Sequence, residues 1–299
     1  MFNINNYIRV DRIRSLVDPR VLWRDIFPLE GGGNARRWLR FQGDLLQKFR
    51  DPHPMKGPIS LFDFNDANDA ADAKNPVPYS VHRWRYSDDA VIGGYSRGIV
   101  NLIQSKEDLE RFERGEKPLH DKKDPDFFPF IRWKGSLDTN VGEDAPPRAV
   151  RSGFCNIRSP EFLFYGAELS RRYNALELTL RTDGRLYWFN IHPDSSLFHS
   201  DLFQAPINVP SAFSDSTTTD SNEETFQRMI LVMKEFRHTK NGRIKENEFK
   251  LAGGINISSI GITLMDGLDG DFLFDLASIR AINFYDGVIY GEEDEDAPY

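Results

Sequence analysis

Ser87-Asp88-Asp89-Ala90-Val91-Ile92-Gly93-Gly94-Tyr95-Ser96-Arg97-Gly98 joins two acidic side chains, a glycine pair and the start of an apolar segment. The glycine pair predicts a shaped turn and not a helix, because glycine has no Cβ and enters positive φ freely. Asp88 and Ser96 flank the pair, and short polar side chains of this kind bond to nearby backbone amides. The stretch therefore predicts a tight loop between two strands, residues 81–87 before it and 98–103 after it.

Strand periodicity continues on both sides of this loop. In residues 176–181 three leucines alternate with polar residues that include Glu177 and Arg181, which is the period of a strand with one buried and one wet face. Asp183-Gly184 then fits the turn of a two-residue hairpin, and residues 187–191 fit its return strand.

Other segments have the same character. Residues 227–234 contain an apolar run that predicts a strand buried on both faces. Further strands are expected at residues 59–64, 130–133, 153–158, 260–264, 272–276 and 281–285. The charged run 107–114 predicts a short solvated helix. Short strands separated by glycine, proline and polar loops, without alternating helices, favour an all-β antiparallel sandwich.

Composition narrows the function classes. With 299 residues, 39% of them hydrophobic, the chain is long enough to bury a sizeable core. A single cysteine, Cys155, excludes an internal disulfide framework and multi-cysteine zinc patterns, and we expect it to pack as a small apolar residue. No apolar run approaches the ~20 residues of a membrane-spanning helix. Net charge is −8, which argues against non-specific nucleic-acid binding.

The amino-terminal region differs in charge from the rest. Residues 1–60 carry eleven Lys/Arg and six Asp/Glu, or +5, which leaves −13 on the remainder. A helix with an apolar stripe is expected at residues 35–50, and it either packs on the sandwich or meets an acidic partner or an anionic lipid surface. The predicted organisation is a basic, partly helical extension (1–57), a β-sandwich domain (58–290) and an acidic tail (291–299).

Catalytic and metal chemistry find little support. His192, Asp194, His199 and Asp201 offer ligand types within ten residues, but their spacing matches no standard zinc site. Asp266, Asp269 and Asp271 could hold calcium, although the run lacks the spacing of an EF-hand and favours a structural turn. We therefore predict no enzyme activity, no cofactor and no metal.

The quoted stretch resembles the aspartate, double-glycine, serine signature of the thirty-kilodalton complex I intermediate-associated protein family, the assembly factors of mitochondrial respiratory complex I. Later segments resemble the same family in the same order, and together they span roughly residues 59–285; they are residues 153–159, 180–187, 233–236, 260–262 and 270–275. The resemblance implies a jelly-roll sandwich similar to galactose-binding-like and carbohydrate-binding modules.

The same resemblance implies a function and partners. The function would be a non-enzymatic assembly factor at the matrix face of the mitochondrial inner membrane that binds membrane-arm intermediates of complex I. The partners would be similar to the family's: an acyl-CoA-dehydrogenase-derived assembly factor, an ECSIT-type adaptor and membrane-embedded assembly proteins. A second hypothesis is a carbohydrate- or small-ligand-binding module that stacks sugars on Trp84, Trp133 or Trp188.

Eight positions match the family motifs and are the candidate site residues: Asp88, Gly93, Gly94, Ser96, Arg158, Asp183, Gly184 and Arg185. In a structural interpretation, Arg158 or Arg185 pairs with Asp88 or Asp183 and fixes loops at one end of the sandwich. In a functional interpretation, the same groups form an exposed polar rim that a partner binds. Turn residues usually serve the turn, which favours the structural interpretation.

Overall fold

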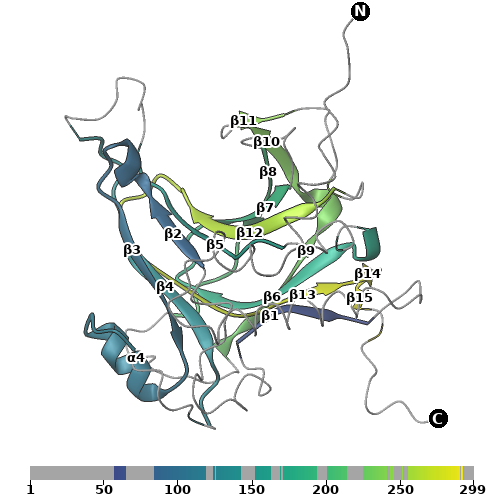
Figure 1. Cartoon of the computed structure of the whole chain (residues 1–299), viewed down its shortest axis with the longest axis horizontal. Coiled ribbons are helices and arrows are strands. Elements are labelled where there is room, and N and C mark those ends of the chain that lie inside the picture. Colours follow the sequence, from purple (N-terminus) through teal and green to yellow (C-terminus); the bar gives the residue numbers. More distant parts are fainter. Residues whose placement is uncertain are drawn as a thin grey trace, which may run out of the picture.

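Two antiparallel sheets face each other across a shared apolar core (Figure 1). The structure is a computed structural model, and it describes residues 57–64, 84–118, 124, 126–142, 152–162, 169, 171–193, 201–213, 225–240, 243–245, 251, 255–289 and 291. All of the strand pairs within the two sheets are antiparallel. The predicted all-β antiparallel sandwich is confirmed.

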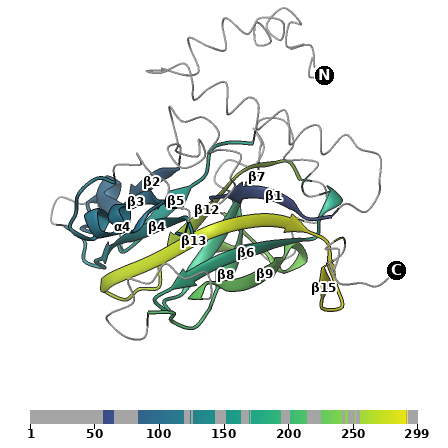
Figure 2. The same ribbon diagram turned by 90° about the horizontal axis from the view of Figure 1, so that it is seen from below.

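The first sheet, called the β13 sheet, has the order β3-β4-β13-β6-β9, and β1 also pairs with β13. Its strands are β1 Ile59–Asp63, β3 Arg97–Ile103, β4 Phe130–Leu137, β6 Ala175–Thr182, β9 Gln227–Val232 and β13 Gly270–Ile282. Figure 2 shows the long β13 running the length of this layer. β13 is therefore the strand on which β1, β4 and β6 are aligned.

The second sheet, called the β12 sheet, has the order β11-β10-β8-β7-β12-β5-β2. Its strands are β2 Arg85–Asp88, β5 Cys155–Arg158, β7 Tyr187–Pro193, β8 Asp201–Ile207, β10 Arg237–Lys240, β11 Arg243–Ile244 and β12 Ile257–Leu264. A small hairpin of β14 Phe284–Tyr285 and β15 Val288–Ile289 follows β13 and projects beyond it (Figure 2).

The core follows from the two-residue period of the strands, because alternate side chains of both sheets point into the space between them. Trp133 lies at its centre, with its ring edge-to-face against Phe272 and Tyr187 at centroid distances of 4.9 and 6.0 Å. Cys155 is buried in the same cluster and unpaired, as expected for a small apolar residue. Full burial of each large side chain contributes roughly 1.5–3 kcal/mol.

Helical structure is short in the described part of the chain: η3 Asp89–Ile92, α4 Lys106–Glu113 and η5 Met233–Glu235. The helix predicted at residues 107–114 is confirmed as α4, and Ser105 Oγ caps it by accepting a bond from the amide of Asp108 at 3.0 Å. It is not simply solvated. Leu109 and Phe112 are buried in a second apolar cluster, where α4 packs against the outer face of the β13 sheet (Figure 1).

Two expectations about strand β6 are wrong. Glu177 and Arg181 are not on a wet face, because each has only 1% of its surface exposed; carboxylate and guanidinium partners on neighbouring strands compensate their charges. Asp183-Gly184 is not the turn of a hairpin either. Strands β6 and β7 belong to different sheets, so the connection crosses from one layer to the other.

Strand β9 also departs from the prediction. It lies at an edge of the β13 sheet and pairs with β6, and most of its residues are half-buried or exposed. An apolar run at a sheet edge is therefore not buried on both faces.

Several predicted features lie outside the described residues: the helix at 35–50 with most of the basic extension 1–57, the metal-ligand candidates Asp194 and His199, and the acidic residues after Gly291. Within the described residues, no helix has the length and apolar character needed to cross a membrane.

Candidate functional site

The quoted stretch folds around Asp89, whose side chain is fully buried at one end of the sandwich. Its Oδ1 accepts a bond from Ser96 N at 3.0 Å, and its Oδ2 accepts bonds from Ser96 Oγ at 2.7 Å and Gly153 N at 2.6 Å. Ser152 Oγ and Phe154 N donate to the same Oδ2 at 2.9 and 3.3 Å. Burial raises the pKa of Asp89, but the bonds from Ser96 and the other donors outweigh burial and hold the pKa below its ordinary value. Asp89 thus joins this loop to the segment before β5 as an ionised carboxylate.

The glycine pair makes this arrangement possible. Gly93 ends η3 at a φ of 82°, in the left-handed region that favours glycine. A Cβ on Gly94 would lie 2.2 Å from the carboxyl carbon of Asp89, so only glycine fits beside it. Asp88 caps η3, because its Oδ1 accepts a bond from Ala90 N at 3.0 Å. The predicted turn at the glycine pair is confirmed, but the expectation that the stretch is not helical is wrong for Asp89–Ile92, which form a short 3₁₀ helix.

Arg185 fixes a second loop, the one between β12 and β13, at the same end of the sandwich. Its Nε and Nη2 donate to the two carboxylate oxygens of Asp266 at 2.9 and 2.7 Å, a bidentate pair. Its Nη1 donates to the carbonyl oxygens of Gly270 and Asp271 at 2.9 and 3.1 Å, and Nη2 also donates to the carbonyl of Leu268. The bond to Asp266 raises the pKa of Arg185. One side chain thereby holds the whole β12–β13 loop.

Asp183 supports Arg185 from the other side. Its carboxylate accepts bonds from Arg185 N at 3.0 Å, Tyr187 Oη at 3.1 Å and Leu273 N at 2.8 Å. Gly184 has a φ of 85°, which lets the chain turn directly after Asp183. The Asp-Gly pair therefore ties the crossover between the sheets to strand β13.

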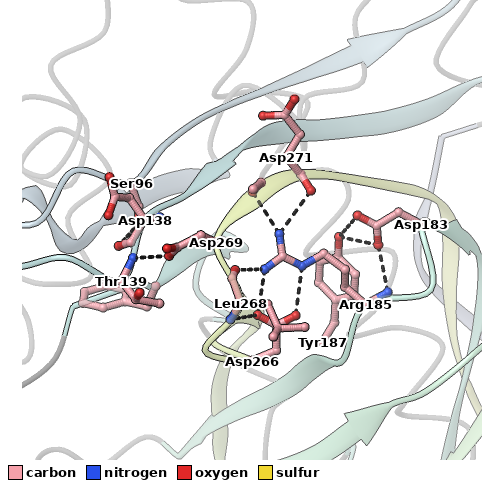
Figure 3. A network of polar contacts seen from close by, with 12 residues as sticks. Ser96, Asp138, Thr139, Asp183, Arg185, Tyr187, Asp266, Leu268, Asp269 and Asp271 are labelled. Carbon is pink, nitrogen blue, oxygen red and sulfur yellow. Dashed lines mark hydrogen bonds and ion pairs between the residues drawn. The ribbon is translucent and has the colours of Figure 1, made fainter.

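Hydrogen bonds between the intervening loops connect the contacts of Asp89 with the contacts of Arg185 (Figure 3). Ser96 Oγ accepts a bond from Asp138 N at 3.0 Å, and Thr139 N donates to Asp269 Oδ1 at 2.6 Å. Asp269 directly follows Leu268, which Arg185 holds. The loops at this end therefore form one continuous hydrogen-bonded network from Asp89 to Asp183.

The structure brings most of the candidate residues together in this network, but not Arg158. Arg158 lies on the outer face of the β12 sheet, where its Nε donates to Ser259 Oγ at 2.6 Å. The expected ion pairs are also wrong in detail. Arg185 pairs with Asp266 and not with Asp88 or Asp183, because the β12–β13 loop places a carboxylate in line with its guanidinium.

No group of three or more potential metal ligands occurs among the residues that the structure describes. Asp266 is paired with Arg185 and Asp269 with the amide of Thr139, as the structural-turn interpretation of this loop predicts. Of the zinc candidates, Asp201 Oδ2 lies 3.2 Å from Nε2 of His238, a residue that the sequence did not suggest.

The sequence did not indicate a second buried polar group, which lies on the face of the β13 sheet that points away from the core between the two sheets. Asp275 accepts bonds from Arg132 Nε and Nη2 at 2.8 Å each and from Arg181 Nε at 2.7 Å, and it is fully buried. The guanidinium of Arg181 also stacks against Phe130 and Phe226, with its carbon 4.8 and 4.6 Å from the ring centroids. The signal was present in the register, since Asp275 lies directly opposite both arginines.

The tryptophans offer little surface for stacking. Trp84 and Trp133 are 6% and 0% exposed and belong to the core, and Trp188 is half-buried. Trp84 and Trp133 therefore fill the interior, and Trp188 alternates with the core residues Tyr187 and Phe189.

Fold and site together define an all-β sandwich whose loop end is fixed by internal carboxylate and arginine contacts. Residues 62–276 match the family model described as Complex I intermediate-associated protein 30 (CIA30). The match covers well over half of the chain, so the chain belongs to this family.

Two relatives of the chain have the same family description. Proteins described as probable complex I intermediate-associated protein 30, mitochondrial, from Caenorhabditis elegans and Caenorhabditis briggsae are each 28% identical over 160 residues, which is 50% of this chain. The match spans 42% of the length of each relative. Among solved structures, a family 11 carbohydrate-binding module of Clostridium thermocellum is similar at 12% identity and a TM-score of 0.43, over 76% of this chain and 96% of the module.

Proposed function

We propose that this protein is a non-enzymatic assembly factor of mitochondrial respiratory complex I, a scaffold that binds membrane-arm intermediates at the matrix face of the inner membrane. Family membership supports the assembly role. The proposed partners are an acyl-CoA-dehydrogenase-derived assembly factor, an ECSIT-type adaptor and membrane-embedded assembly proteins.

The observation that carries the proposal is the contrast at the loop end between satisfied polar groups and exposed apolar ones. Asp89, Arg185 and Asp266 bond to the protein's own loops. Tyr95, Met265 and Leu268, which we call the loop-end rim, are 53%, 50% and 62% exposed. Clustered exposed apolar side chains are typical of protein interaction sites.

The rim belongs to the fixed network. Gly94 forms a β-bridge with Val141. The hydroxyl of Tyr95 lies close to Gly142, because a Cβ added there would be only 2.9 Å from it. The backbone of Leu268 is also fixed, because Arg185 donates hydrogen bonds to the carbonyl oxygens of both Leu268 and Gly270. Loops already held in one conformation lose less entropy when a partner binds them.

The test is genetic and then structural. Deleting the gene should reduce assembled complex I on a native gel, and the wild-type chain should restore it. Leu268→Asp should fail to restore it, because loss of a central apolar anchor costs about 2 kcal/mol, or roughly 30-fold in affinity.

Ile244→Asp is the matched control, since Ile244 is 67% exposed on β11 and lies outside the rim. Both variants should unfold at the wild-type temperature. A normal amount of complex I in the deletion strain would contradict the assembly role. Full rescue by the Leu268 variant would show that the loop-end rim is not needed for assembly.

A further inference from the structure

Four side chains form a row across the outer face of the β12 sheet, which we call the arginine row: Arg85, Arg158, Ser259 and His192. Their chain neighbours Tyr86, Ile157, Ile260 and Ile191 pack in the core. Since successive side chains alternate between faces, the row points away from the core. Arg85 is directly opposite Arg158, and Ser259 is directly opposite His192. The row thus crosses strands β2, β5, β12 and β7.

Two like charges face each other in this row. Direct opposition of like charges on neighbouring strands is destabilising, because the Cβ atoms lie about 5 Å apart. Burial lowers the pKa of Arg158; the charge of Glu161 acts against this, and the smaller effect of Arg85 adds to the lowering. Glu161 acts at longer range than an ion pair, since no carboxylate of the described residues lies within 4.0 Å of either guanidinium.

Five other arginines, from the fully buried Arg181 to the exposed Arg228, show how this protein treats structural guanidinium groups. Arg132 and Arg181 share Asp275, Arg185 pairs with Asp266, and Glu177 pairs with both Arg228 and Arg280. Each of these cations has a carboxylate within hydrogen-bond distance. The arginine row lacks such a carboxylate, although the chain carries a net charge of −8.

Polar groups lie beside Arg158. Arg158 donates to the hydroxyls of Ser259 and Ser258 at 2.6 and 3.4 Å. Nε2 of His192 is buried and has no hydrogen-bond partner, which carries a desolvation penalty. Burial, together with the charge of Arg158, lowers the pKa of His192 to about 3, so its ring is neutral near pH 7 and offers one N–H.

We propose that the arginine row binds a phosphate group. Two guanidinium groups match the two negative charges of phosphate, and the geometry of the guanidinium fork suits its oxygens. The half-buried Ser258 hydroxyl and the unpaired imidazole of His192 add further polar groups, and the fully buried Ser259 holds the Arg158 side chain in place. A bound phosphate would offset the repulsion between Arg85 and Arg158. This site lies on a sheet face and does not depend on the proposed assembly role.

The test uses the full chain and inorganic phosphate, titrated by calorimetry against chloride at constant ionic strength. Wild-type protein should bind one phosphate. Arg85→Gln and Arg158→Gln should each weaken binding by about tenfold or more, since a charged hydrogen bond contributes roughly 1.5–3 kcal/mol. Arg237→Gln is the control, because Arg237 is an exposed arginine on β10 of the same sheet. It removes the same charge and should leave binding unchanged.

Vesicles distinguish a free phosphate from a lipid headgroup. Sedimentation with phosphatidylcholine vesicles containing phosphatidic acid, but not with phosphatidylcholine alone, would identify the headgroup as the source. Binding to neither phosphate nor these vesicles overturns the proposal. Equal loss of binding in the Arg237 variant also overturns it, since the attraction would then be general surface charge.

A stability measurement separates binding from a structural role. Arg85→Gln removes a repelling charge but no hydrogen bond that the described residues make with it. In phosphate-free buffer its melting temperature should equal or exceed that of the wild type, and added phosphate should no longer raise it. A lower melting temperature in phosphate-free buffer would make Arg85 a structural residue and would overturn the proposal.

Discussion

Replacing Asp275 by asparagine, D275N, removes the one negative charge that Arg132 and Arg181 share behind the β13 sheet. Three short N–H···O bonds reach this carboxylate, at 2.8, 2.8 and 2.7 Å. An amide of the same size keeps one acceptor oxygen and turns an NH₂ group toward a donor. With its oxygen in the place of Oδ2, the amide keeps the bonds from Arg132 Nη2 and Arg181 Nε but loses the bond from Arg132 Nε. The two bonds that remain lose the acceptor charge, while both guanidinium groups stay where they are.

The expected cost follows from these contacts. Each hydrogen bond to a charged group contributes roughly 1.5–3 kcal/mol against about 0.5–1.5 kcal/mol for a neutral one, so losing one bond and weakening two costs about 3–5 kcal/mol. Breaking a buried ion pair on one side costs about 3–5 kcal/mol by a separate estimate. Glu113 accepts a bond from Arg132 Nη1 at 2.6 Å and remains as a partial counter-charge, which favours the lower part of the range. We expect about 3–4 kcal/mol, a large share of a typical unfolding free energy of about 5–15 kcal/mol.

Urea unfolding at pH 7, followed by tryptophan fluorescence, measures this difference. Glu113→Gln is the control, because its side chain is 41% exposed and surface pairs contribute about 0–1 kcal/mol. Replacing all three charged residues by apolar ones, R132M/D275L/R181M, should restore most of the loss, since no unpaired charge is left in the interior. A destabilisation by D275N below about 1 kcal/mol would refute the assignment of Asp275 as the shared buried counter-ion.

Three further predictions concern the loop end and the core. Gly94→Ala should destabilise the protein by about 3 kcal/mol in urea unfolding, because its Cβ would lie 2.2 Å from Asp89 Cγ. Gly267→Ala, with no atom within 4 Å of the new Cβ but a φ of 76°, should cost less, about 1–2 kcal/mol from the left-handed backbone alone. The lowered pKa of Asp89 adds stability that is fully present above the unfolded pKa of about 3.9 and is lost as pH falls through the folded pKa. Asp89→Asn should therefore reduce the loss of unfolding free energy at acid pH. An unchanged dependence of the unfolding free energy on acid pH would contradict this prediction. Burial raises the pKa of Cys155 to about 11, so a thiol reagent at pH 8 should modify it only on unfolding; rapid labelling of native protein would count against this placement.

Strand positions were predictable because alternation reports directly which side chains are buried. Ile260, Ile262 and Leu264 of β12 alternate as the pattern predicts, and all three lie in the core. The pairing of strands was not predictable in the same way. Asp183-Gly184 has the chemistry of a hairpin turn, yet β6 and β7 lie in different layers, since a two-residue period does not indicate which strand pairs with which.

Buried charge was the second limit. A pattern of alternating leucines places Glu177 and Arg181 opposite the core, and a charged residue there is ordinarily solvated. In this fold the aromatic residues Phe130 and Phe226 cover Arg181 on that face, and Arg228 and Arg280 pair with Glu177, so both charged residues are buried and paired. Only the register of β13 against its neighbours shows that Asp275 meets two arginines.

The distribution of charge decides how function should be mapped in this protein. Asp89, Asp183 and Asp275 each join segments far apart in the sequence, so substituting any of them lowers the stability of the fold together with whatever the protein binds. Loss of complex I in such a variant would therefore say nothing about an interface. Variants at Leu268 and Arg85 leave the buried network intact, because one is an exposed apolar side chain and the other an exposed cation. Opposite results from these two positions would separate partner binding from anion binding, which no variant of the buried carboxylates could do.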